Sequence, residues 1–334
     1  MNRRQRVAEA IAHRQPDKVP YHISFTVPAR EAMTRWYRDP QFEALLGNCL
    51  LLLETEPKNS WKRVRGEVWE DQFGVQWDRT IDADIGTVCN SPLTRDNLAT
   101  YPFPDPLDPS RFEDWAALLA GRPDSFVVAN IGFSLFERAW TLAGMETVLM
   151  AMVDDRRFLD HLLDRILDFN LKLIEKACSF PIDAMRFGDD WGQQRGLIMG
   201  PVLWRELIGP RVRQMYSLVK SKGKKVFIHS CGKVDELFPD LIESGLDVFN
   251  PFQPEVMDVY EMKRRYGDRL SFFGGISTQK TLPYGTIPQV KEEVRRLLDA
   301  IGRNGGYIAS PAHDIPRDAK PENIAAMIEV LQAQ

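Results

Sequence analysis

From about residue 110 to its end, the chain alternates strand-like and helix-like segments, and this alternation constrains the fold most. The predicted strands are short apolar runs, separated by amphipathic helical segments, at Phe126–Ile131, Ala184–Asp190, Val226–Cys231, Asp247–Asn250, Leu270–Ile276 and Gly306–Ser310. Strands that alternate with helices in this way are typical of a parallel sheet covered by helices. The pattern therefore predicts an α/β fold.

The first hundred residues add a further strand and an insertion. Val19–Phe25 is predicted as the first strand, and residues 29–55 as mostly helical. Alternating apolar residues between Trp61 and Asn90 predict a β-hairpin that turns near Asp71–Gly74. We therefore predict a single (β/α)8 TIM barrel over residues 1–334, with an N-terminal helical and β-hairpin insertion at about 29–100. The eighth strand is not assigned.

Composition excludes several classes of partner. Lys plus Arg is 43 and Asp plus Glu is 47, so the net charge of −4 gives no reason to expect a nucleic acid or an acidic membrane surface. The longest apolar run, Leu50–Leu53, is far too short to cross a bilayer. Four cysteines in 334 residues do not form a disulfide framework. A cytoplasmic protein without membrane or nucleic-acid partners is expected.

Polar residues follow nearly every predicted strand. In a barrel the carboxyl ends of all strands meet at one mouth, where such folds place their active sites. Any one of these residues could instead form a turn or cap a helix, but their recurrence favours function. His22, Asn130, Asn250 and Gln253 are accordingly predicted to bind substrate.

A metal site is the sharpest prediction for this mouth. His229 and Cys231 are two residues apart, so on a strand their side chains point to the same face. An imidazole nitrogen and a thiolate sulfur suit zinc, and His313 after the last strand would provide a third ligand with one position left open. The alternative is that Cys231 is a small core residue and the histidines are hydrogen-bond partners of the substrate.

Asp189 and Asp190 are the predicted catalytic carboxylates. Adjacent residues on a strand point to opposite faces, so we expect one of the two to enter the mouth. There it could act as a general acid or base, bind a cationic group, or cap the following turn.

Five motifs together resemble a known family. In chain order they are Gly188-Asp189-Asp190-Trp191-Gly192, His229-Ser230-Cys231-Gly232, Asn250-Pro251-Phe252-Gln253-Pro254, Phe273-Gly274-Gly275-Ile276 and Gly305-Gly306-Tyr307-Ile308. Over roughly residues 120–334 the chain resembles the uroporphyrinogen decarboxylase superfamily. The similarity is closest to its methyltransferase-like branch, which includes methylcobalamin:coenzyme M methyltransferases and zinc-dependent O-demethylase components.

The resemblance implies a (β/α)8 barrel and a zinc ion held by His-x-Cys and a later Cys. His229 and Cys231 match the first two ligands, whereas the later position is His313. The decarboxylases of this superfamily carry an arginine-rich segment after the first strand, where this chain has only Arg30. A substrate with many carboxylates demands several cations.

The resemblance therefore implies a zinc-dependent methyltransferase that moves a methyl group between a small O-, N- or S-methylated compound and a corrinoid protein. The corrinoid (cobalamin) would be supplied by that partner protein. Two alternatives remain open. One is a decarboxylase of a carboxylated substrate that uses Asp189 or Asp190 without a metal, and the other is a non-catalytic ligand-binding barrel.

Overall fold

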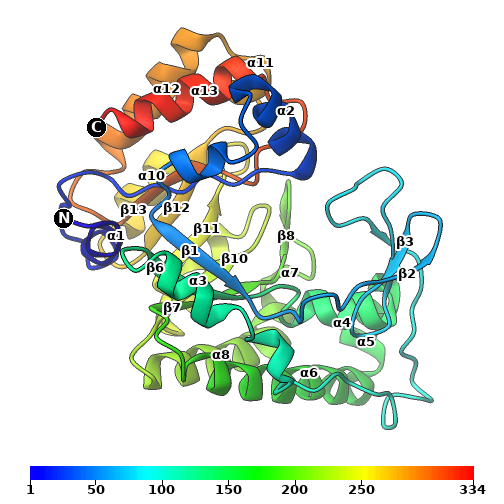
Figure 1. Ribbon diagram of the computed structural model, residues 1–334. Coiled ribbons are helices and arrows are strands. Elements are labelled where there is room, and N and C mark those ends of the chain that lie inside the picture. The colour runs from blue at the N-terminus through cyan, green and yellow to red at the C-terminus, as the bar shows by residue number, and fades with distance from the viewer.

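A curved parallel sheet of seven strands forms the centre of the computed structural model, which describes all 334 residues (Figure 1). Every neighbouring pair of strands in this sheet is parallel. The strands, in sheet order, are β1 (Leu50–Glu54), β6 (Phe126–Ile131), β7 (Ala184–Gly188), β10 (Lys225–His229), β11 (Val248–Phe252), β12 (Ser271–Ile276) and β13 (Tyr307–Pro311). The prediction of an α/β fold with a parallel sheet is confirmed.

Helices connect successive strands and cover the outer face of the sheet. Figure 1 shows α6 and α8 along one side of the sheet and α12 and α13 along the other. The connecting helices are α3 (Trp115–Gly121), α4 (Phe136–Ala143), α5 (Met145–Asp154), α6 (Arg156–Ala177), α7 (Gly200–Leu203), α8 (Gly209–Ser221), α9 (Phe238–Glu243), α10 (Val259–Tyr266), α11 (Thr281–Tyr284) and α12 (Ile287–Ala300), and α13 (Pro321–Gln332) follows the last strand. None of them combines the length and apolar character that crossing a bilayer requires.

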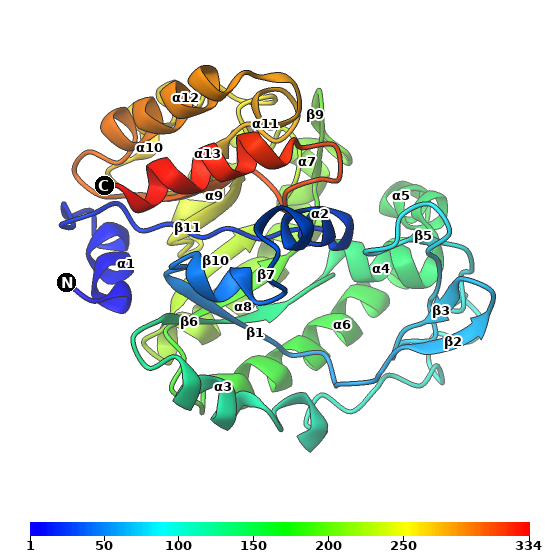
Figure 2. The same ribbon diagram turned by 45° about the horizontal axis from the view of Figure 1, so that its top comes forward.

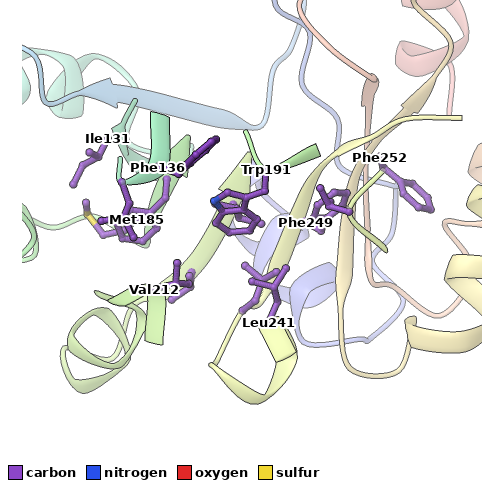
Figure 3. Close-up of a cluster of buried hydrophobic side chains, with 14 of the residues drawn as sticks. Ile131, Phe136, Met185, Trp191, Val212, Leu241, Phe249 and Phe252 are labelled. Carbon is purple, nitrogen blue, oxygen red and sulfur yellow. The ribbon is translucent and has the colours of Figure 1, made fainter. Parts of the chain in front are cut away.

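The main core lies between this helical layer and the sheet. Met185 of β7 and Phe249 of β11 point outward, toward Val212 of α8 and Leu241 of α9 (Figure 3). All four side chains are fully or almost fully buried. Because alternate strand residues point to opposite faces, the residues on either side of Met185 and Phe249 point inward.

The amino ends of the strands are closed by α1 (Arg3–Ile11). Val7 and Ile11 of this helix are buried in a small apolar cluster with inward side chains of the sheet. Those inward side chains are Leu50, Phe126, Val128, Ala184, Phe227, Val248, Phe273 and Ile308. The interior of the curved sheet is thus filled and apolar at this end.

The prediction that residues 29–55 are mostly helical is wrong for the last part of that range. A helix, α2 (Val27–Tyr37), is followed by a short 3-10 turn, and Leu50–Glu54 then forms β1. The run Leu50–Leu53 is apolar throughout, and such a run shows no period that distinguishes a buried helix from a strand buried on both faces. Its partner strand decides the outcome, since Leu50 pairs with Phe126 and Glu54 with Asn130.

The predicted first strand, Val19–Phe25, is not a regular strand. It makes isolated parallel bridges from Tyr21 to Ala309 and from Phe25 to Ile315. The carbonyl oxygen of Tyr21 also accepts a hydrogen bond from the backbone N–H of Cys49, just before β1. The segment therefore bonds to both edges of the sheet, and Pro20, which lacks an N–H group, limits how regular that pairing can be.

The insertion contains a separate antiparallel sheet of β2 (Lys62–Arg65), β3 (Val68–Glu70), β4 (Gln76–Asp78) and β5 (Thr87–Val88). The predicted hairpin corresponds to β3 and β4, which are joined by a turn at Asp71–Val75. Figure 2 shows this sheet beside α4 and α5, away from the α1 end of the molecule. A two-stranded hairpin of β8 (Gly192–Gln193) and β9 (Gly196–Leu197) follows β7.

Candidate metal centre

His229, Cys231 and His313 lie together at the carboxyl ends of the strands. One potential ligand atom of each residue lies within 4.8 Å of those of the other two. The Sγ atom of Cys231 is 3.4 Å from Nε2 of His229, and the two imidazole rings meet edge to face with centroids 5.3 Å apart. His313 is exposed and the other two residues are partly buried. Two imidazoles and one thiol at this spacing form a donor set suited to zinc.

Asn250 orients the ring of His229. Its Nδ2 donates to the carbonyl oxygen of Phe273, which turns its Oδ1 toward Nδ1 of His229 at 2.6 Å. This contact is shorter than the 2.9 Å from Nδ1 to Nη2 of Arg186, and it is a hydrogen bond only if Nδ1 carries the proton, which leaves Nε2 with a free lone pair. Burial and then the charge of Arg186 lower the pKa of His229 to about 3, so the ring is neutral. Asn250, a predicted substrate-binding residue, thus holds the imidazole in the form that a metal requires.

The thiol of Cys231 needs a cation beside it to ionise. Burial and the nearby carboxylate of Asp190 raise its pKa well above the usual value for cysteine. A metal ion would reverse that balance, because metal-bound thiols lose their proton.

The two predicted catalytic carboxylates face different partners. Asp189 accepts hydrogen bonds from the backbone N–H groups of Leu135, Phe136 and Glu137 and from the indole of Trp191, so it caps the amino end of α4. Asp190 instead accepts from the backbone N–H of Cys231 at 2.7 Å. The structure therefore brings only Asp190 to the cysteine.

Two glycines allow the turns after β7 and β10 to touch. A Cβ atom at Gly192 would lie 2.6 Å from the carbonyl oxygen of Cys231. Gly232 has a φ of +84° and also packs against the backbone of Gly192. Both positions thus require glycine, and this contact keeps Asp190 beside Cys231.

Glu137 and Arg186 were not identified from the sequence. Glu137 lies in the first turn of α4, and burial together with the charges of Asp190 and Asp189 raises its pKa well above the usual value. Arg186 points inward from β7, and its Nη2 donates to Oδ1 of Asn250 at 3.1 Å. An arginine in an otherwise apolar strand is unusual, so the sequence could have indicated Arg186 as a functional residue. No local pattern in the sequence indicates Glu137.

The other predicted substrate-binding residues are more dispersed. His22 is buried, its Nδ1 has no hydrogen-bond partner, and burial followed by the charge of Arg186 lowers its pKa to about 3. Asn130 donates to Glu54 at 2.8 Å. Gln253 is buried just after β11, and its side chain makes no hydrogen bond.

A cavity of about 310 Å³ lies between the insertion sheet and the carboxyl ends of β1 and β6. Trp61, Trp77 and Phe133 supply part of its wall, and Arg79 stacks over Trp61 at 4.1 Å from the ring centroid. Its charged lining residues are Glu54, Glu56, Asp71, Asp84, Arg79, Arg111 and Arg138. Burial raises the pKa values of Glu54 and Glu56. Asn130, which lines the cavity, pairs with Arg186 on the sheet, and Arg186 in turn contacts His229.

Comparisons with known proteins agree with this architecture. The uroporphyrinogen decarboxylase of Shewanella amazonensis is 24% identical over 254 residues, which are 71% of this chain and 68% of that protein. The methylcobamide:CoM methyltransferase MtaA of Methanosarcina barkeri is 28% identical over 131 residues, 39% of this chain and 36% of that protein. A methyltransferase from Methanosarcina mazei shares the fold with a TM-score of 0.75 at 16% identity, covering 100% of this chain and 99% of that one.

The chain also matches a protein family as a whole. Residues 125–334 match the family described as Uroporphyrinogen decarboxylase (URO-D), and they include β6 to β13 with the cluster of His229, Cys231 and His313. The matched residues make up more than half of the chain. This chain therefore belongs to the uroporphyrinogen decarboxylase family.

Proposed function

We propose that this protein is a zinc-dependent methyltransferase that moves a methyl group between a small methylated compound and a corrinoid protein. The observation that carries the proposal is the convergence of His229, Cys231 and His313 within 4.8 Å at the mouth of the curved sheet. Three protein ligands with a further position open to substrate are typical of catalytic zinc. The relatives that are named methyltransferases support the type of reaction.

The residues present fit a zinc ion. Nε2 of His229 has a free lone pair because Nδ1 faces an acceptor, and the Sγ atom of Cys231 is 3.4 Å from it. A bound zinc ion would supply a Lewis acid that polarises the heteroatom carrying or accepting the methyl group. The set of His, Cys and His has one soft thiolate fewer than the His, Cys and Cys set of the methyltransferase branch, and a harder zinc site of this kind favours an oxygen or nitrogen donor over sulfur.

The chain's own residues would orient these groups. Asn250 fixes the ring of His229, and Asp190 holds the backbone of Cys231. The aromatic wall of the cavity, with Trp61, Trp77 and Phe133, would exclude water from the bound compound. We further propose that Val19–Phe25 takes the eighth position of a single barrel domain spanning residues 1–334, since it bonds to both sheet edges.

The corrinoid is assigned to a separate protein. The relative named methylcobamide:CoM methyltransferase acts on a methylated corrinoid, according to its name. For methyl transfer the cobalt must approach the open side of the cluster, where His313 is exposed. We therefore place the corrinoid protein over the carboxyl ends of the strands.

Decarboxylation is the second candidate, and the relatives named uroporphyrinogen decarboxylase favour it. The charges of the cavity oppose it, because its four carboxylates outnumber its three guanidinium groups. Arg138 is already paired with Asp71, and Arg30, after the predicted first strand, is paired with Glu43. A substrate with many carboxylates would find few free cations here.

Elemental analysis of the purified protein and of two cysteine variants tests the proposal. We expect one zinc per chain in the wild type and in Cys89→Ala, whose exposed thiol lies in the insertion. In Cys231→Ala we expect zinc affinity and methyl transfer to free cobalamin, followed by its absorbance, to fall by more than about 100-fold. Changes outside the ligand set alone cost 10- to 100-fold. Full activity without metal, or turnover of uroporphyrinogen, would refute the proposal.

A further inference from the structure

Arg186 is a partly buried, charged side chain on the inner face of the curved sheet, and no carboxylate pairs with it. It lies on β7 between Asn130 of β6 and Phe227 of β10. Its Nη2 donates a hydrogen bond to Oδ1 of Asn250 at 3.1 Å. Nη2 also lies 2.9 Å from Nδ1 of His229, the nitrogen that must carry a proton. The buried Nε has no hydrogen-bond partner, and no carboxylate oxygen lies within 4.0 Å of a guanidinium nitrogen, the limit for an ion pair.

The three buried arginines of the chain, in contrast, all have hydrogen-bond or ion-pair partners. Arg138 pairs with the carboxylate of Asp71 at 2.9 Å. Arg211 pairs with Asp160 and Asp164 at 2.9 and 2.7 Å. Arg111, on the cavity wall, donates to three oxygens, those of Asp105, Thr55 and Gln72. Arg186 is thus the exception, because its Nε–H group has no acceptor.

An unpaired buried charge is costly, and proteins normally pair it. The carboxylates nearest to Arg186 are committed elsewhere, since Glu54 accepts from Asn130, Asp190 from the backbone of Cys231, and Asp314 from Ser24. Their charges act on Arg186 only from beyond contact distance. His22 adds a second orphan, the Nδ1 atom, to the same interior, where its ring packs against the inward side chain of Phe273.

We propose that Arg186 binds an oxyanion, a carboxylate or a sulfonate, carried by the small-molecule substrate. The planar guanidinium group presents its free N–H groups to such an anion, and charge-assisted hydrogen bonds of this kind are strong. The inference rests on the proposed function in taking this mouth as the reaction site. It deepens that function by naming a substrate class.

The position of Arg186 also limits the size of the substrate. Its Nη2 touches the ring of His229, a proposed ligand, at 2.9 Å, and its sheet neighbour Asn130 lines the cavity. An anion bound to Arg186 therefore lies next to the cluster, and the reacting heteroatom must be only a few bonds from the anionic group. A compact anion fits this geometry. It could be the methyl donor or the methyl acceptor.

Calorimetric titration of the zinc-loaded full-length protein distinguishes the two sources. The donor arm compares methoxyacetate with uncharged methoxyacetamide, and the acceptor arm compares 2-mercaptoethanesulfonate with 2-mercaptoethanol. In one arm we expect the anion to bind at least about tenfold more tightly than its neutral counterpart, as for a charge-assisted hydrogen bond. Arg186→Gln should abolish that preference and Arg186→Lys should keep part of it. Arg213→Gln, an exposed arginine paired with Glu243 on the outer face, should leave it unchanged.

Zinc content, measured in each variant, separates this proposal from the proposed function. An arginine that only supports Asn250 and His229 would alter zinc content and leave the ratio of the two affinities unchanged. A wild type without anion preference in either arm would overturn the proposal, and so would an equal preference in Arg186→Gln. If Arg186→Gln does not fold, the wild-type ratio and its reduction in Arg186→Lys decide. A protein without zinc that still prefers the anion would refute the zinc site alone.

Discussion

The inner face of the curved sheet has different chemistry at its two ends, although the same strands build both. The amino ends of the strands form the closed end, and their carboxyl ends form the open end. On β10, Phe227 is fully buried in the apolar layer that α1 closes. Two residues later on the same face, His229 belongs to the cluster of potential metal ligands. One strand therefore contributes a packing residue and a candidate ligand within one inward-facing row.

The residues that stabilise the fold by packing and the residues suited to chemistry thus lie at opposite ends of the same strands. The closed end gains from burying apolar surface and tolerates no cavity. The open end holds groups that burial makes costly, such as the charge of Arg186 and the carboxyl group of Glu137. Substitutions at the two ends should consequently have different effects.

Truncation at the closed end should have the largest effect on stability. Phe227→Ala leaves a cavity in the layer under the sheet, and we expect it to lower the free energy of unfolding by about 3–5 kcal/mol. His229→Ala on the same strand should reduce the stability of the metal-free protein less but abolish zinc binding. Urea unfolding of both variants without zinc, with zinc titrations at 10 °C, measures the two effects. Equal losses of stability would contradict the separation of the two ends.

Asp189, which follows β7, should have a smaller effect on stability that depends on pH. Burial raises the pKa of Asp189 to about 6, although four N–H groups donate to it. The folded state therefore holds this proton more tightly than the unfolded state does. Its contribution to stability is complete below about pH 4 and is lost as the pH rises to about 6.

The stability difference between the wild type and Asp189→Asn should consequently fall by up to about 3 kcal/mol between pH 4 and 7. Urea unfolding at several pH values measures it. Asp155→Asn is the matched control, because the partly exposed Asp155 also caps a helix, α6. Its hydrogen bond from Arg95 lowers its pKa, so its contribution is lost as the pH falls. A difference for Asp189→Asn that is constant with pH would show that this carboxyl group does not titrate in the range.

The strands of the sheet were easier to predict from the sequence than the contacts within the candidate site. Periodicity located six of the seven strands of the sheet, because each is a short apolar run flanked by helical segments. It missed β1, where Leu50–Leu53 is buried on both faces and lacks a period, and it overstated the regularity of Val19–Phe25. Pairing with β6 and β13, far along the chain, decides these two segments.

For the site, alternation along a strand was enough to place some residues. It predicted that His229 and Cys231 share a face, and their Nε2 and Sγ atoms lie 3.4 Å apart. It also predicted that Asp189 and Asp190 point in different directions, and the two carboxyl groups accept from different segments. It did not predict that Asn250 would contact His229, because their contact depends on the parallel register of β10 and β11. Glu137 reaches Asp190 only through the packing of α4 beside β7. Such contacts between distant segments have no local signature.

The smallest expected effect comes from Asn250, at the boundary between the two ends. Its amide connects the backbone of β12 to Nδ1 of His229, and it thereby fixes which nitrogen of the ring carries the proton. Asn250→Ala should leave all three proposed ligands in place but free the ring to rotate and change tautomer. We expect zinc affinity to fall by about 10- to 100-fold, as for other partners of metal-bound histidines. Competition with a chromophoric chelator measures this. Asn250→Asp, which keeps an acceptor facing Nδ1, should restore most of the affinity, whereas equal losses in both variants would mean that Asn250 acts through packing and not through the tautomer of His229.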